Sequence, residues 1–129
     1  MIGHVTVKPG AGFPTLGPAG IRILAALDNF AREHEIQLTV TSGSEPMGRL
    51  PTDPHPRGAA VDVAIAPSVL LDLLNALHAE LGPLFTVLYE VPNQSAILLG
   101  LKGYAYVNPL ATGPHIHIQP VRGTTWPPT

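Results

Sequence analysis

Two stretches of the chain carry apolar residues at the three- and four-residue spacing of a helix with one buried face. The first predicts a helix over residues 17–34, opened by Pro18. Its apolar residues recur as Ile21, Leu24, Leu27 and Ala31. The second predicted helix opens at Pro67 and Ser68 and ends at Gly82 and Pro83. Its stripe consists of leucines, namely Leu70, Leu73, Leu74, Leu77 and Leu81.

Alternation of apolar and polar residues predicts strands over residues 36–41, 59–65, 84–90, 95–101 and 114–119. Residues 91–94 are expected to join two of these strands as a hairpin. The other segments read as an extended arm over 1–16, a long ordered loop over 43–58 and an irregular tail over 120–129. The pattern predicts one α+β domain, 1–129, with two helices packed on a small antiparallel sheet.

Composition narrows the class of protein. Hydrophobic residues make up 45% of the 129 residues, and the chain is long enough for one domain with a buried core. Charged residues make up only 12%, about half the usual share. The net charge of −2 comes without a basic cluster, so nucleic-acid binding is not expected. The chain has no cysteine, which excludes disulfides and thiolate metal sites. We expect no membrane span and no secretory signal, hence cytoplasmic synthesis.

The predicted strand over 59–65 carries one carboxylate in an apolar setting. Because successive side chains on a strand point to opposite faces, Val61, Val63 and Ile65 share a large apolar face. Asp62 points the other way and has only alanines beside it, at positions 60 and 64. An unpaired Asp within a strand is unfavourable, so Asp62 is expected to have a specific partner.

Three histidines accompany this carboxylate. His115 and His117 alternate with isoleucines, so both imidazoles are expected on one face of the last strand, with Gln119 beside them. His55 stands between two prolines, which hold its backbone extended. Imidazole nitrogen and carboxylate oxygen suit zinc, which commonly keeps three protein ligands and one open position in catalytic sites. The sequence therefore predicts one metal site built from these residues.

The two motifs carry a resemblance to a known family. His55, Gly58, Ala60 and Asp62 follow the HxxGxAxD signature of the zinc D-Ala-D-Ala carboxypeptidases and L-alanyl-D-glutamate endopeptidases, which cut peptidoglycan peptides. The later His-x-His also resembles the last motif of that family. The resemblance spans residues 36–119. It implies a zinc-dependent hydrolase of bacterial cell-wall peptides, with His55, Asp62 and His117 as metal ligands and His115 as the acid/base.

Other family positions differ here. The family usually carries an Arg two residues after Thr-Ser-Gly, where it stabilises the oxyanion, but this chain has Glu45. Arg49 is the candidate to take that catalytic role, and Arg57 is its alternative. Many members also place an acidic base three residues before the last metal ligand, where Pro114 stands. Glu45 and Glu90 are alternative general bases.

Two further interpretations stay open beside the peptidase. The chain could be a non-catalytic module of the same fold, used for structure or interaction, for example in a phage particle. A peptidase of this kind is expected to be released by a phage-type route or to be associated with a virion. A cupin-type barrel would need a Glu three or four residues after the second histidine, where Pro120 and Val121 stand.

Overall fold

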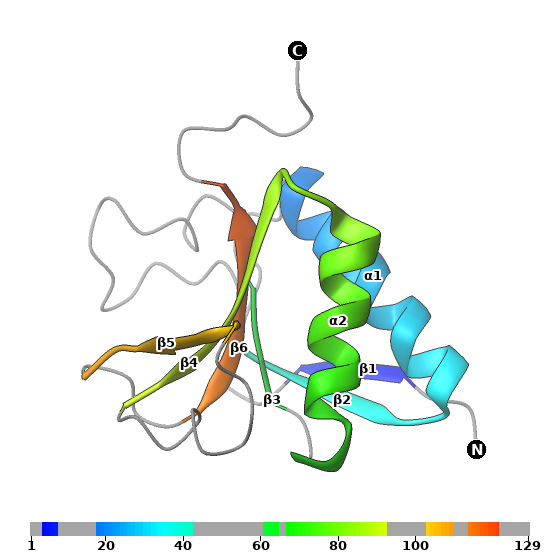
Figure 1. The fold of residues 1–129 in the computed structure, drawn as a ribbon. Helices are drawn as coiled ribbons and strands as arrows, with labels where there is room; N and C mark the ends of the chain where they lie inside the picture. The colour runs from blue at the N-terminus through cyan, green and yellow to red at the C-terminus, as the bar shows by residue number, and fades with distance from the viewer. Residues whose placement is uncertain are drawn as a thin grey trace.

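The computed structural model describes residues 4–7, 18–42, 61–64, 67–92, 103–109 and 114–121, which form two helices and a six-stranded sheet (Figure 1). The α+β class predicted from the sequence is confirmed. The helices are α1 (Pro18–His34) and α2 (Leu70–Leu81), the latter preceded by the 3-10 turn η2 (Pro67–Val69). The strands are β1 (His4–Val7), β2 (Gln37–Ser42), β3 (Val61–Ala64), β4 (Phe85–Val91), β5 (Ala105–Val107) and β6 (His115–Pro120).

The sheet is mixed, and in this respect the expectation of a small antiparallel sheet was wrong. Its strand order is β1-β2-β3-β6-β4-β5. The inner pairs β2–β3, β3–β6 and β6–β4 are antiparallel, whereas the edge pairs β1–β2 and β4–β5 are parallel. For β1 and β2 the reason is the connection through α1: a strand, a crossover helix and a second strand place these two strands parallel. Strand β1 was predicted only as part of an extended arm.

The apolar core lies between the two helices and one face of the sheet (Figure 1). All five leucines of the predicted α2 stripe are buried, as the spacing predicts. In α1 the expected stripe was partly wrong, because Ile21 is 56% exposed. The buried face of α1 centres instead on Ile23, Leu27 and Phe30, and Leu24 packs at its margin. Ile21 and Ile23 stand about 200° apart around a helix, so they cannot share one face.

The two faces of the sheet differ in chemistry. Its core face carries Val61 and Val63 of β3 and Ile116 and Ile118 of β6, all fully buried. The opposite face, which we call the site face, carries polar residues at the alternate positions of β3, β4 and β6. These are Asp62, Glu90, His115, His117 and Gln119. Neither helix of the described part has the length and apolar content to cross a membrane.

The C-terminal end of α2 matches the expected punctuation, whereas the predicted opening at Pro67 and Ser68 is the 3-10 turn η2 and α2 itself begins at Leu70. α2 ends where Gly82 takes a φ of 77°, a left-handed backbone conformation that glycine adopts without strain. The expected loop over 43–58, the strand over 95–101 and nearly all of the 120–129 tail lie outside the described residues. In the described sheet, β4 is flanked by β6 and β5.

Replacing Leu77 by Ala should lower the free energy of unfolding by about 2–5 kcal/mol, because Leu77 is fully buried between α2 and the sheet. Leu71→Ala is the matched control on the same helix. Leu71 is 45% exposed, so its loss should cost about 1 kcal/mol or less. Urea unfolding of both variants measures the difference. Equal losses would contradict the assignment of the buried face of α2.

Candidate active site

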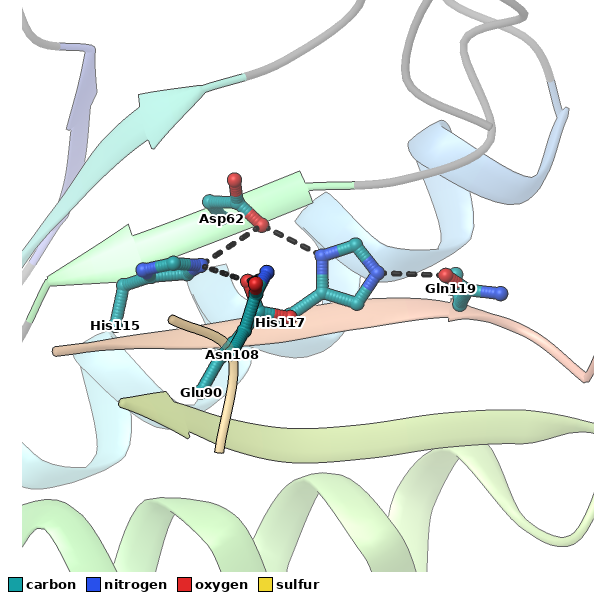
Figure 2. Close-up of polar contacts among 6 residues, drawn as sticks. All are labelled: Asp62, Glu90, Asn108, His115, His117 and Gln119. Carbon is teal, nitrogen blue, oxygen red and sulfur yellow. Dashed lines mark hydrogen bonds and ion pairs between the residues drawn. The ribbon is translucent and has the colours of Figure 1, made fainter. Parts of the chain in front are cut away.

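Asp62 and His117 meet on the site face because their strands pair in register. Asp62 of β3 lies directly opposite His117 of β6. Residues directly opposite one another on antiparallel strands have neighbouring side chains on the same face. The Nδ1 atom of His117 lies 2.7 Å from the Oδ1 atom of Asp62 (Figure 2). The partner expected for Asp62 from the sequence is therefore His117.

His115 approaches the same carboxylate from two residues earlier on β6. Its Nε2 atom is 3.8 Å from Asp62 Oδ1, a longer separation than that of His117. Both imidazoles therefore point toward Asp62, as the alternation of His115 and His117 with isoleucines predicts (Figure 2). The side chains of Asp62, His115 and His117 are only 12–18% exposed. Polar groups this far from water are stable only when they are paired.

Glu90 adds a second carboxylate to the site. It lies on β4 directly opposite His115, and its Oε1 atom is 3.3 Å from His115 Nε2. Asn108, just beyond the end of β5, donates from Nδ2 to the same Glu90 oxygen at 3.1 Å. The backbone of Asn108 is itself tied to β4, because its N–H donates to the Val91 carbonyl at 2.8 Å. Glu90 is thus held on two sides.

Gln119 completes the described site. It lies two residues after His117 on β6, and its Oε1 atom is 2.6 Å from the Nε2 atom of His117 (Figure 2). The two ring nitrogens of His117 therefore face two different oxygens, one from Asp62 and one from Gln119. This arrangement fixes the orientation of the ring in its plane.

The electrostatics of the site follow from these contacts. Burial has the largest effect on His117 and by itself lowers its pKa. The hydrogen bond and charge of Asp62, with smaller effects of Gln119 and Glu90, act in the opposite direction and leave the pKa of His117 raised. The pKa of Glu90 is lowered, chiefly by its hydrogen bond with His115 and against the effect of burial. Asn108 and the nearby charges of His117 and His115 lower it further.

The donor set suits a metal in its chemistry but is incomplete in the described residues. Within those residues, no group of three or more His, Cys, Asp or Glu side chains is arranged to hold a metal ion. Asp62 and His117 supply two adjacent donors, 2.7 Å apart. Zinc bonds of about 2.0–2.2 Å in a tetrahedron hold two ligand atoms roughly 3.3 Å apart. The Asp62 oxygen and the His117 nitrogen would therefore have to move apart only slightly to admit the ion. The third predicted ligand, His55, lies outside the described residues.

Part of this site was predicted from the sequence. Asp62, His115 and His117 were expected to lie together, and in the described structure they do. Arg49, Arg57 and Glu45 lie outside the described residues, so their predicted roles stay predictions. Glu90 was named from the sequence only as an alternative base.

The contact of Asn108 with Glu90 was missed, because it depends on the pairing of β5 with β4. The three-residue strand β5 has no apolar alternation that could have revealed this pairing.

Comparisons with protein-family models, with curated proteins and with solved structures found no match to this chain. The resemblance to the zinc peptidoglycan peptidases therefore rests on the residues of the two motifs.

In the Glu90→Gln variant, the free energy of unfolding should fall less steeply with decreasing pH than in the wild type. A lowered pKa in the folded state means that the Glu90 carboxylate stabilises the fold above the unfolded-state pKa of about 4.5, and that this contribution is lost as the pH falls through the folded-state pKa. Urea unfolding of metal-free protein between pH 3 and pH 7 should therefore show a shallower decline for the variant below about pH 4.5 than for the wild type.

Glu33→Gln is the matched control, because Glu33 is exposed on α1, away from the site. Its stability should follow the wild-type curve across the same pH range. Parallel curves for wild type and Glu90→Gln would show that the contacts of Glu90 with His115 and Asn108 do not stabilise its charged form.

Proposed function

We propose that the chain is a zinc-dependent peptidase that cleaves a peptidoglycan stem or cross-link peptide near a D-amino acid. One observation carries this proposal. On the site face, Nδ1 of His117 lies 2.7 Å from Oδ1 of Asp62. The imidazole of His115, which can accept or donate a proton, lies beside them. This arrangement matches the roles that the motif resemblance implies for the same three residues. Clusters of buried, mutually perturbed ionisable groups are typical of functional sites.

In this proposal His55, Asp62 and His117 hold the zinc. Two of them are adjacent donors in the structure, and His55 is assigned by the motif alone. Zinc bound there supplies a Lewis acid that polarises the scissile carbonyl and lowers the pKa of a nearby water. The side chains of Asp62 and His117 are only 12–13% exposed. Electrostatic interactions between such largely buried groups are stronger than in water.

His115 acts as the general acid/base. Its Nε2 atom lies 3.8 Å from Asp62 Oδ1, close enough to serve a metal-bound water, and the motif resemblance assigns it the acid/base role. There it can accept a proton from the attacking water and deliver a proton to the leaving amine. Glu90, 3.3 Å away, compensates the positive charge that His115 gains in the first step. Arg49 is proposed to stabilise the oxyanion, which is the work of the family's missing Arg.

One feature favours a second candidate function. Glu45 stands where the family carries its oxyanion-stabilising Arg. A negative group at that position opposes a developing negative charge, and a donor there is worth several kcal/mol in related sites. The alternative is a non-catalytic module of the same fold that keeps the metal for structure, for example in a phage particle.

His115→Ala should retain zinc but lose roughly 100-fold or more of the cleavage rate, the usual contribution of a positioned acid/base. The measurement is the release of new amino termini or D-Ala from purified muropeptides, with zinc content determined on the same samples. A chelator should stop the wild-type reaction. His78→Ala is the control, because His78 is exposed on α2 and should leave the rate unchanged.

Full activity of the zinc-loaded His115→Ala variant would end the assignment of His115 as the acid/base. If zinc-loaded wild type cleaves no muropeptide at all, the peptidase proposal fails and the non-catalytic module is favoured.

A further inference from the structure

The side-chain amide of Gln119 is held between His117 and the backbone of its own strand. Its Nε2 atom lies 3.3 Å from the Pro120 carbonyl oxygen and donates a hydrogen bond to it. Its Oε1 atom lies 2.6 Å from the Nε2 atom of His117. Because His117 and Gln119 are two residues apart on β6, both side chains project from the same face.

These two contacts determine which way the amide faces. A carbonyl oxygen only accepts hydrogen bonds, so the NH₂ group of Gln119 must face Pro120. The flipped amide would bring two acceptor oxygens together, Oε1 of Gln119 and the carbonyl oxygen of Pro120. The amide oxygen of Gln119 therefore faces His117 and accepts a hydrogen bond from it. His117 must carry a hydrogen on Nε2.

In the metal-free protein Nδ1 of His117 also faces an acceptor, the Asp62 carboxylate, so the ring donates from both nitrogens. With Nε2–H held by Gln119, Nδ1 is the nitrogen that would give up its hydrogen to a metal. Nδ1 is the atom that points at Asp62, at 2.7 Å, where the zinc is proposed to bind (Figure 2). Histidines that bind metals commonly donate their other ring N–H to an acceptor, which fixes both the tautomer and the ring orientation.

We infer that Gln119 is a positioning residue of the metal site: it holds His117 as the Nε2–H tautomer, anchored through the Pro120 carbonyl, so that Nδ1 is the atom that binds zinc. The inference rests on the proposed zinc site, and it assigns a role to a side chain that does not touch the metal. The contacts of the two histidines of β6 also differ, which fits their different proposed roles. The Nε2 atom of His117 faces Gln119, whereas the Nε2 atom of His115 faces Glu90 and Asp62.

The test is the zinc dissociation constant, measured by competition with a chromogenic chelator, which needs no enzymatic activity. Gln119→Leu removes the acceptor and keeps the apolar part of the side chain. It should raise the zinc dissociation constant about 10- to 100-fold, the usual effect of losing such a contact. Gln119→Glu loses the hydrogen bond to Pro120 but keeps an acceptor, now a charged one, for the Nε2–H of His117, and should recover most of the zinc affinity that Gln119→Leu loses. Gln119→Asn, with a shorter reach, should behave like Gln119→Leu.

Gln37→Leu is the matched control. Gln37 lies on β2 and makes a similar amide hydrogen bond, to the Thr6 hydroxyl at 3.1 Å, away from the site. The zinc affinity of the Gln37→Leu variant should equal that of wild type. Nitrogen-15 spectra of the histidine rings give a second readout: in zinc-loaded wild type, the Nε2 atom of His117 should be protonated and its Nδ1 atom metal-bound.

The outcomes separate the two proposals. If wild type binds no zinc, the metal site fails and the role of Gln119 fails with it. If wild type binds zinc but Gln119→Leu and Gln119→Asn bind it equally tightly, the metal site stands and the inference about Gln119 is overturned. Zinc bound through the Nε2 atom of His117 would also overturn it. A weaker Gln119→Leu together with a restored Gln119→Glu supports it.

Discussion

Strand β6 lies between β3 and β4, and its register with both strands determines which side chains meet on the site face. It sets His117 against Asp62 and His115 against Glu90. A slip of one residue would turn both imidazoles into the core and both isoleucines out of it. Ile116 and Ile118 are fully buried, and each contributes about 1.5–3 kcal/mol by leaving water, so the core strongly opposes such a slip. Burial of the apolar face of β6 thus fixes the register that places the polar side chains of its other face.

The polar side of this arrangement is a row of groups that depend on one another. Asp62 and Glu90 would be costly to bury as isolated charges, as would either imidazole in its protonated form. Their contacts change that balance: His117 lies between Asp62 and Gln119, and His115 lies near both carboxylates. Removing one member would leave its neighbour inadequately paired, so a substitution here is expected to change the proton affinity of the remaining groups as well as stability.

Local patterns were sufficient to predict much of this molecule. The leucine spacing of α2 and the valine and isoleucine alternation of β3 and β6 report directly on burial, and burial follows the period of the element. Alternation also predicted the face on which Asp62, His115 and His117 lie. Their meeting requires β3 beside β6, which was expected from the metal-ligand chemistry that the three residues share. Ile21 was assigned wrongly, since several apolar positions of α1 compete for one buried face.

The features that could not be predicted from the sequence depend on contacts between residues far apart in the chain. The pairing of β1 with β2 and the three-residue strand β5 depend on contacts that no periodicity encodes. Glu90 lies near His115 only because β4 neighbours β6. The hydrogen bond from Asn108 to Glu90 depends on the position of β5 as well. The bond from His117 to Gln119 depends on an amide orientation set by the Pro120 carbonyl. Such details arise from strand order and hydrogen-bond geometry.

We propose that the site face binds one zinc ion between Asp62 and His117, with His115 beside it and not bound. The most direct test is an anomalous difference map at the zinc absorption edge from crystals grown with zinc. The account predicts one strong peak about 2 Å from the Nδ1 atom of His117 and from the Asp62 carboxylate, with His55 as the third protein ligand. A map with no peak there, or a zinc ion bound by His115 and not by His117, would contradict it.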